Sequence, residues 1–391
     1  MTAPAFLPAS AAAARLGVKR ATLYAYVSRG LLRAYVLPGR RGSWFDPVQL
    51  DAATAKAKRP HERRPDLRIV SGLTLIDRGG YWYRGRRPQT LADTHSFEQV
   101  AEFLWNGAAT DAHPPWRADR AGLTAARKVL RALPGEVGAV DALRFAVSAQ
   151  SLVDPLRFDR RPSGLVATAR RLVATALAAT SGRPTGPAAA QVAAWIGARS
   201  DRARLAAIDD VLVLMADHEL AASTVAVRVA ASFGADPYAA VAAGFGAMSG
   251  TRHGAASRRL EDALAAMRRR VSPARAAISL LDDEGAPPGF GHPLYPDGDP
   301  RVPPILALAA RFGSTAHADR LLDTLRAQGA SRPNVDFALA AFTQALGVAP
   351  GAGEALFTAA RLAGWLAHAM EEYAARTDFR LRAIYSGDRP E

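Results

Sequence analysis

The sequence predicts an all-α fold with a small basic module in front of it. Alanine is abundant and aromatic residues make up only 7% of the chain, which favours closely packed helices over sheets. Apolar stripes at helical spacing run through residues 141–156, 164–180 and 188–200. Strand and helix patterns do not alternate, and no internal repeat is present. A chain of 391 residues can bury a large core, divided over two or three domains.

Composition excludes several classes of protein. The chain has no cysteine, which rules out disulfides, thiolate nucleophiles and cysteine-bound metals. No uncharged apolar run reaches the roughly 18–20 residues that span a bilayer. The first residues lack the basic start of a secretory signal. We therefore expect a cytoplasmic protein that does not enter a membrane.

Positive charge is concentrated near the N-terminus. Residues 1–67 hold twelve Lys or Arg and four Asp or Glu, so about a sixth of the chain carries +8 of the net charge of +14. Such a concentration favours a polyanionic partner for this segment rather than for the whole protein. We expect a domain over residues 1–57 and a solvated linker at 58–67.

Residues 1–57 have the pattern of short helices and a hairpin. Ser10 is the expected cap of the first helix and Gly17 its end, and a second helix follows directly. Two short helices separated by a tight glycine turn are typical of a helix-turn-helix. A hairpin with its tip at residues 38–42 comes next, and Asp46 begins a third helix.

This arrangement resembles the winged helix-turn-helix head of MerR-type regulators and phage excisionases. The resemblance implies that the second helix enters the major groove of DNA while the hairpin tip contacts phosphates. The alternative is a basic docking module that has lost DNA binding. The candidate DNA contacts are Lys19, Arg20, Thr22, Tyr24, Arg40 and Arg41.

The remainder of the chain begins with short extended segments and continues as helices. A strand-like start turns at Gly79-Gly80, and Ser96 opens the helix that follows. Further on, residues 215–254 have apolar and small side chains at helical spacing. This stretch predicts two packed helices that join near Asp236-Pro237.

Polar residues stand at both ends of residues 215–254. His218 and Glu219 lie at one end and His253 at the other. A buried imidazole either finds a hydrogen-bond partner in the core or takes part in chemistry, and both interpretations stay open for this stretch alone. On a helix, the adjacent His218 and Glu219 would face about 100° apart and make a poor metal pair.

Common catalytic motifs are absent. The sequence has no phosphate-binding GxxxxGK[ST] loop, no GxSxG elbow and no HExxH. Gly244, Gly246 and Gly250 have the wrong spacing for a dinucleotide loop, and no strand precedes them. No metal site is therefore predicted.

Histidines, arginines and an aspartate remain, grouped in short blocks. A glycine- and proline-rich loop at 289–301 holds His292 and Arg301, Asp336 lies just inside an apolar helix, and Arg361 follows. Guanidinium groups bind carboxylates through paired hydrogen bonds. Aspartate and histidine suit proton transfer at carbon. The set predicts a small polyanionic substrate.

Six motifs in order resemble the citrate synthase family, and the resemblance extends over residues 68–391. The motifs are ADHELAAST, RHG, GFGH, DPR, PNVDF and AR-x-x-GW, preceded by YRG and SFEQVAEFLWNG. The resemblance implies an all-α homodimer with shared active sites that needs no metal or covalent cofactor. It also implies a large subdomain at 68–253 and 341–391, and a small mobile subdomain at 254–340 that closes over the substrate.

The resemblance further implies that acetyl-CoA condenses with oxaloacetate and water to give citrate and CoA. Asp336 would take a proton from the acetyl methyl carbon, while His253 hydrogen-bonds to the thioester oxygen. His292 would polarise the keto group of oxaloacetate. The residues implied to bind its carboxylates are His218, Arg301, Arg361 and Arg380, the last of them from the partner subunit.

Departures from the family pattern leave alternatives open. The family's HGGAN reads HGAAS at 253–257, Pro293 follows the histidine of GFGH, and the family's Arg-Pro-Arg reads Arg-Leu-Arg at 380–382. These changes affect the expected CoA contacts, so a 2-methylcitrate synthase that uses propionyl-CoA is one alternative. Another is a DNA-binding regulator in which the synthase body senses metabolites.

Overall fold

The computed structural model describes residues 6–28, 32–35, 42–47, 49–50, 69–77, 79–108, 114–134, 137–250, 256–281, 287–375, 377 and 379. The chain divides into two compact units, Met1–Arg68 and Ile69–Glu391. Strands form only two short antiparallel pairs within the described residues, so the predicted all-α fold is confirmed. Among the described helices, none is long and apolar enough to cross a membrane.

The first unit contains two short helices and a pair of strands. β1 (Leu7–Pro8) pairs antiparallel with β2 (Trp44–Phe45), and α1 (Ala9–Leu16) and α2 (Arg20–Ser28) lie between them in sequence. Gly17 ends α1 in the left-handed conformation, with a φ of 67°, as predicted. The buried hydrophobic side chains of this unit are Ala9, Ala12, Ala13, Leu23, Leu32, Phe45 and Leu50.

The start of α1 differs from the prediction. Pro8, not Ser10, occupies the N-cap position, and its extended backbone (φ −67°, ψ 158°) provides no side-chain cap. Because proline fixes φ in this range and lacks a backbone N–H, Pro8 both ends β1 and sets the first helical position at Ala9. Ser10 therefore lies inside the first turn, where it caps nothing.

The predicted hairpin is described only in part. Tyr35 and Trp44 exchange backbone hydrogen bonds of 2.8 Å, which brings its two arms together. Residues 36–41, which include most of the tip, lie outside the described residues, as does most of the third helix. Positions 47, 49 and 50 of that helix are helical.

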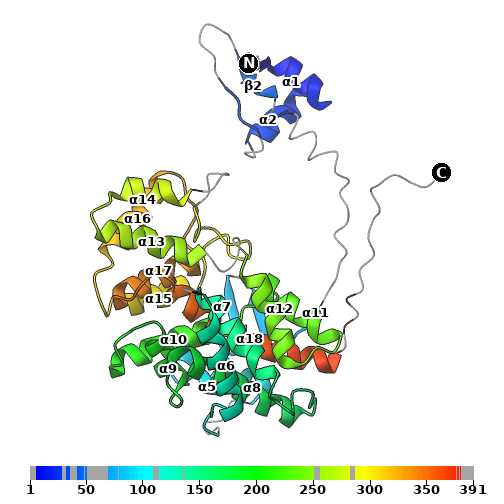
Figure 1. Cartoon of the computed structure of the whole chain (residues 1–391). Coiled ribbons are helices and arrows are strands. Elements are labelled where there is room, and N and C mark those ends of the chain that lie inside the picture. The colour runs from blue at the N-terminus through cyan, green and yellow to red at the C-terminus, as the bar shows by residue number, and fades with distance from the viewer. Residues whose placement is uncertain are drawn as a thin grey trace, which may run out of the picture. The chain divides into compact units, whose positions relative to one another are not determined.

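The second unit opens with a hairpin and continues as helices (Figure 1). β3 (Thr74–Asp77) pairs antiparallel with β4 (Gly80–Tyr83), where a strand and turn were predicted. Ser96 caps the helix that follows through a reciprocal pair of hydrogen bonds with Gln99. The helices up to residue 250 are α4 (Pro88–Ala92), α5 (Phe97–Asn106), α6 (Arg120–Ala132), α7 (Ala139–Ser151), α8 (Pro162–Ser181), α9 (Ala188–Trp195), α10 (Arg202–Met215), α11 (Ala222–Ser232) and α12 (Pro237–Met248). Those after residue 255 are α13 (Ala256–Arg268), α14 (Pro273–Leu280), α15 (Val302–Ala309), α16 (Ala316–Ala327), α17 (Val335–Leu346) and α18 (Ala352–Ala375).

The larger core of this unit surrounds α18. This helix contacts α5, α7, α8, α10, α11 and α12, and its side chains are buried over almost its whole length. Trp365, near its centre, is completely buried. Side chains of α18 are therefore held by close packing from several directions.

A smaller core lies among α13, α14, α16 and α17, the group at the upper left of the second unit in Figure 1. Its buried members include Leu260, Leu264, Leu280 and Leu321. The helix α17 belongs to both cores, because Val335 is buried in the larger one and Phe337 in the smaller one. Asp336 thus lies at the junction of the two cores.

The two helices predicted within residues 215–254 are α11 and α12, which pack against each other. Asp236 caps α12 by accepting a 3.0 Å hydrogen bond from the backbone N–H of Ala239. The predicted junction near Asp236-Pro237 is confirmed. The glycines at 244 and 246 lie within α12, so the rejection of a dinucleotide loop after a strand is also confirmed.

Gly244 allows α12 to approach its neighbours closely. A Cβ atom at this position would lie 2.7 Å from Cγ2 of Val227 and 3.0 Å from the ring of Trp365. We expect Gly244→Ala to lower the free energy of unfolding by about 1–3 kcal/mol, because neither neighbour can move away freely. Gly246→Ala is the matched control on the same helix, since nothing lies within 4 Å of its Cβ position. It should be neutral or stabilising by about 0.5–1 kcal/mol. Urea denaturation compares the two variants, and equal effects would contradict the close-approach argument.

Candidate active site

A cavity of about 660 Å³ lies between the loop after α10, the end of α12 and the loop that precedes α15. This volume suits a small organic substrate. His218 and His292, two of the predicted site residues, line it. A larger cavity of about 880 Å³ contains none of the predicted site residues, so we centre the site on the smaller one.

His218 lies in the loop between α10 and α11. The sequence placed it together with Glu219 at the end of a helix, but Glu219 has a φ of 53°, which breaks helical geometry at this point. The ring of His218 is buried, and its Nε2 lies 2.9 Å from the Tyr295 hydroxyl. Burial, together with the charges of Arg301 and Arg361, holds the pKa of His218 well below its usual value. The imidazole is therefore neutral.

His292 packs edge-to-face against His218, with the two ring centres 5.3 Å apart. Its Nδ1 accepts a 3.2 Å hydrogen bond from the backbone N–H of Leu294. Burial and the charge of Arg301 lower the pKa of His292. A neutral imidazole whose Nδ1 accepts carries its proton on Nε2, so Nε2–H is free to donate to a substrate.

Backbone contacts fasten the His292 loop to the start of α17. Gly291 N–H donates to the carbonyl of Arg332 at 2.8 Å, and Asn334 N–H donates to the carbonyl of Gly289 at 2.8 Å. The Asn334 side chain adds a 3.0 Å bond to the carbonyl of Gly291. The histidine loop and the N-terminus of α17 are therefore positioned as one piece.

Asp336 occupies the first turn of α17. Protein surrounds its carboxyl, although part of the residue's surface stays accessible. Burial raises the pKa of Asp336 to about 7; the charge of Arg301 opposes the rise and Asp299 reinforces it. A carboxylate that titrates near neutral pH is suited to accept a proton from carbon.

Asp299 connects Arg301 with α17. Its two oxygens accept from Nε and Nη2 of Arg301 at 2.9 and 2.7 Å, and Oδ2 also accepts from the backbone N–H of Val335 at 3.1 Å. Burial alone would raise the pKa of Asp299, but the Arg301 guanidinium holds it below its usual value. The predicted substrate arginine is thus anchored to the helix that carries Asp336.

Arg361 is a buried guanidinium with unused donors. It lies on α18, and only 1% of its surface is exposed. Its Nε and Nη1 have no hydrogen-bond partner, and the nearest carboxylate oxygen, Oδ1 of Asp217, is 3.9 Å from Nη1. Burial lowers the pKa of Arg361, against the effect of Asp217. Because buried donors without a hydrogen-bond partner are costly, Nε and Nη1 of Arg361 point to an anionic ligand.

Two predicted site residues, His253 and Arg380, lie outside the described residues. In the first unit, Arg40 and Arg41 do too. Lys19, Arg20 and Tyr24 are exposed on or beside α2, and Thr22 is partly exposed. Among the described residues, no group of His, Asp and Glu has the arrangement of a metal site.

Comparison with known proteins identifies the second unit. The sequence model of the citrate synthase C-terminal domain matches residues 68–382. The chain belongs to the citrate synthase family. A 2-methylcitrate synthase of Mycobacterium tuberculosis is 31% identical, with 86% of this chain and 95% of that protein covered. A citrate synthase of Mycolicibacterium smegmatis is 30% identical over 78% of this chain and 88% of its own length.

Solved structures agree in fold. The citrate synthase of Thermoplasma acidophilum, solved with carboxymethyl coenzyme A and oxaloacetate, has a TM-score of 0.68 at 24% identity. It covers 83% of this chain, and 96% of its own length is matched. The protein is accordingly an enzyme of the citrate synthase type, with a first unit that lies outside the matched family domain.

Sequence reasoning assigned no role to three residues of this citrate synthase site. Asp217 and Asp299 are buried beside the predicted arginines, and Tyr295 hydrogen-bonds to His218. All three occur inside or beside the quoted motifs, as the Asp of ADHELAAST, the Asp of DPR and the Tyr after GFGH. Adjacency to a predicted site residue was the only sequence signal that could have found them.

Proposed function

We propose that the protein condenses acetyl-CoA with oxaloacetate and water to give citrate and CoA. The observation that carries this proposal is the carboxyl of Asp336, whose pKa is raised to about 7 beside a loop that holds a neutral histidine. The reaction needs a base for a weak carbon acid and a hydrogen-bond donor for the carbonyl that is attacked. It needs no metal or covalent cofactor.

In the proposed mechanism Asp336 removes a proton from the carbon next to the thioester. His253 donates a hydrogen bond to the thioester oxygen while the enol forms, and Nε2–H of His292 polarises the keto oxygen of oxaloacetate. The new carbon–carbon bond gives citryl-CoA, the keto oxygen takes up a proton, and water then cleaves the thioester. Closure of residues 254–340 over the substrates would keep bulk water away until the condensation is complete.

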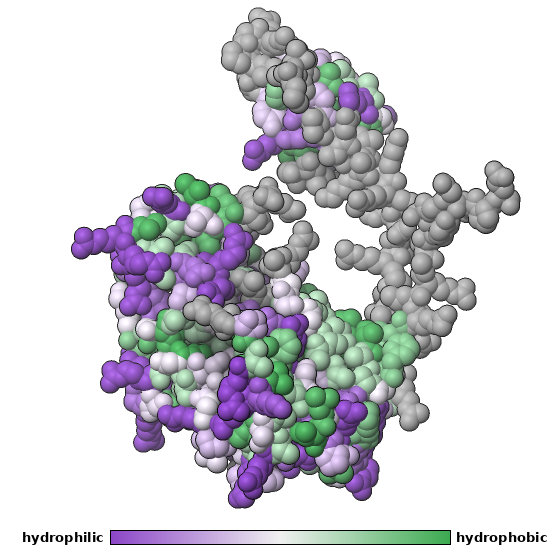
Figure 2. All heavy atoms as spheres, in the orientation of Figure 1, coloured by the Kyte–Doolittle hydropathy of each residue, from purple (hydrophilic) through white to green (hydrophobic). Residues whose placement is uncertain are grey.

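His218, Arg301, Arg361 and Arg380 are the proposed ligands of the oxaloacetate carboxylates. The unused donors of Arg361 support this assignment, because a carboxylate would satisfy them. Arg380 would come from the partner subunit of a homodimer. Hydrophobic residues gather on the face over α11 and α12 (Figure 2). Val229 and Phe233 are large hydrophobic side chains exposed at α11, and such a surface favours subunit contact.

The assay of free CoA release with oxaloacetate tests the proposed reaction. We expect release with acetyl-CoA, and we expect kcat/KM to rise with pH through about 7, because Asp336 must be ionised to act as the base. The ionised fraction increases as pH passes the raised pKa and then levels off. No CoA release at micromolar enzyme, with either acetyl-CoA or propionyl-CoA, would refute the function.

Propionyl-CoA, which would give 2-methylcitrate, is the second candidate acyl donor. The names of several relatives, including the one from Mycobacterium tuberculosis, favour it. The ratio of kcat/KM for the two thioesters, measured in one assay, decides between them.

The first unit favours an additional role in binding duplex DNA through a winged helix-turn-helix. Arg20 and Tyr24 are one helical turn apart on α2 and exposed, Lys19 precedes them, and Leu23 between them is completely buried. A short helix with one buried face and two cations at its start can enter the major groove. This role is compatible with the enzyme activity and would make the protein a regulator as well.

Salt dependence of DNA binding tests this role. We expect the Lys19→Ala, Arg20→Ala double variant to reduce the slope of log K against log salt by about 0.9 for each of the two side chains that contacts a phosphate. Lys128→Ala, an exposed lysine on α6, is the control and should leave the slope unchanged. Binding that persists after deletion of residues 1–60 would exclude the first unit as the DNA-binding element.

A further inference from the structure

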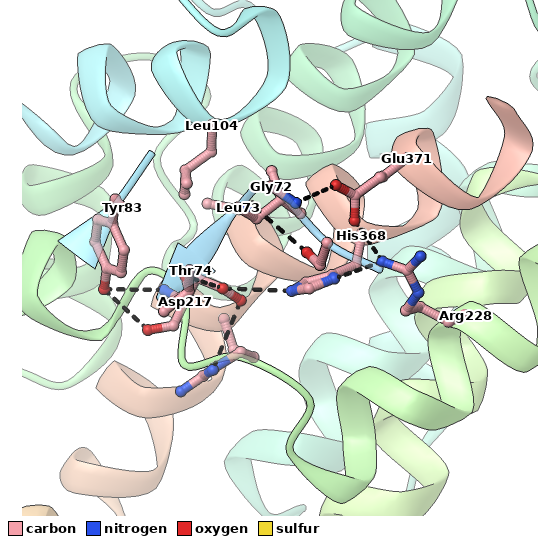
Figure 3. A network of polar contacts seen from close by, with 12 residues as sticks. Gly72, Leu73, Thr74, Tyr83, Leu104, Asp217, Arg228, His368 and Glu371 are labelled. Atoms are coloured by element: carbon pink, nitrogen blue, oxygen red, sulfur yellow. Dashed lines mark hydrogen bonds and ion pairs between the residues drawn. The ribbon is translucent and has the colours of Figure 1, made fainter. Parts of the chain in front are cut away.

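A buried series of polar contacts joins Thr74 and Asp217 to His368 and Arg228 (Figure 3). At its centre is Asp217, which is completely buried. Its Oδ2 accepts hydrogen bonds from the Thr74 hydroxyl and from Nε2 of His368, the latter at 3.3 Å. Its Oδ1 has no hydrogen-bond partner and faces Nη1 of Arg361 at 3.9 Å. One oxygen is therefore held by donors, and the other is turned toward the arginine.

The direction of the hydrogen bonds follows from Arg228. This side chain is completely buried, and its Nη1 lies 3.1 Å from Nδ1 of His368. A guanidinium can only donate, so Nδ1 of His368 must accept. The proton of the neutral imidazole is then on Nε2, where it donates to Asp217. Arg228 therefore orients the His368 ring through Nδ1, and the ring orients the Asp217 carboxylate through Nε2.

Arg228 cannot turn away from this arrangement. Its Nε donates to Glu372 at 3.0 Å, and its Nη1 lies 2.5 Å from Oε2 of Glu371. The other oxygen of Glu371 accepts from the backbone N–H of Gly72 at 2.8 Å. Two carboxylates on α18 thus hold the guanidinium in place.

Helix α18 carries both Arg361 and His368, and Asp217 lies next to it. Arg361, Gly364 and His368 are three and four residues apart, so they lie along one face of the helix. A Cβ atom on Gly364 would collide with Oδ1 of Asp217 and lie 2.6 Å from the carbonyl oxygen of Ala216. Only glycine lets the Asp217 loop approach this face closely enough for the carboxylate to lie between the arginine and the histidine.

We propose that Asp217 and His368 are positioning residues that orient Arg361 for the keto-acid substrate. The Asp217 oxygen holds the guanidinium by its charge without forming a hydrogen bond, so a substrate carboxylate would displace no existing hydrogen bond of Nε or Nη1. His368 fixes the rotation of the carboxylate by occupying its other oxygen. This inference rests on the proposed role of Arg361 in binding oxaloacetate, and neither positioning residue touches the substrate.

The kinetic constants of Asp217→Asn test whether the negative charge of Asp217 positions Arg361. The amide removes the negative charge and places either an uncharged oxygen or an NH₂ group opposite Arg361. We expect the KM for oxaloacetate to rise about 10-fold or more, while the KM for acetyl-CoA changes little. A general loss of structure would instead lower the melting temperature and affect both KM values. An unchanged KM for oxaloacetate would overturn the proposal.

A pair of substitutions at His368 tests whether this residue orients the Asp217 carboxylate. In His368→Gln, the amide oxygen can accept from Arg228 and the NH₂ group can donate to Asp217, which reproduces the pattern of the neutral imidazole. His368→Met fills similar space but can do neither. We expect the methionine variant to raise the KM for oxaloacetate about 10-fold and the glutamine variant to stay within about 3-fold of wild type. Equal KM values in the two variants would refute the orientation argument.

Calorimetric titration with oxaloacetate separates this proposal from the proposed reaction. The full chain should bind oxaloacetate more weakly in Asp217→Asn and His368→Met than in wild type, whether or not CoA is released. If wild type binds oxaloacetate but releases no CoA, the reaction is refuted, and weaker binding by the two variants still supports the positioning residues. Equal affinity in wild type and both variants overturns the positioning proposal, and no binding by wild type overturns both.

Discussion

Asp336→Asn is expected to lower kcat by about 10²–10⁴-fold, the usual contribution of a positioned general base. Asparagine has nearly the same shape as aspartate but cannot accept the proton from the thioester's carbon. The KM values for oxaloacetate and acyl-CoA should change little, because the fold around α17 stays intact. Steady-state CoA release gives these constants, and turnover equal to wild type would contradict the assignment of the base.

The same substitution should stabilise the protein. The pKa of Asp336 is raised to about 7 in the folded chain from an ordinary value of 3.8, so ionisation of this group opposes folding. This penalty grows as pH rises from the ordinary value to about 7 and is constant above it. We expect the melting temperature of Asp336→Asn to exceed that of wild type, with a difference that increases up to about pH 7. Asp297→Asn, an exposed carboxylate before α15, should show neither effect.

Arg361→Lys is expected to raise the KM for oxaloacetate between about 10- and 150-fold. Lysine keeps the positive charge, but its ammonium group cannot form the paired hydrogen bonds that a guanidinium fork offers a carboxylate. A hydrogen bond to a charged group contributes about 1.5–3 kcal/mol, which sets this range. Arg326→Lys on the exposed surface of α16 is the control. If the KM for oxaloacetate stays at the wild-type value, the unused donors of Arg361 do not bind the substrate.

Local sequence signals predicted the second unit well where a single turn or cap decides the structure. Asp236 begins α12 and Ser96 begins α5, because each side chain bonds to a backbone N–H three residues later. The same reasoning was wrong for Ser10, because Pro8, two residues before it, already sets the start of α1. His218 was placed on a helix, but the positive φ of Glu219 belongs to a loop. A positive φ is uncommon for a residue other than glycine, so nothing in the sequence indicated it at Glu219.

Asp217, one of the site residues that sequence reasoning missed, depends on contacts between distant segments. Asp217 meets Thr74 across 143 residues and His368 across 151. No spacing rule connects such positions, so the aspartate could be read only as part of a motif. By contrast, Asp336 could be singled out, because a lone carboxylate at the start of an apolar helix is unusual in the sequence itself. The raised pKa of Asp336 could not be predicted from the sequence, because it results from burial by the surrounding protein.

The walls of the cavity differ in how much change they can tolerate. One side is the loop after α10, where His218 lines the cavity but is buried in the surrounding protein, so a larger side chain there has no room. The other side is the loop around His292, where Pro293 and Leu294 face the cavity but are exposed. Evolution or engineering of substrate choice should therefore proceed through the loop around His292, while the loop that holds His218 stays unchanged. A library restricted to positions 293 and 294 would sample new thioesters at little cost to folding.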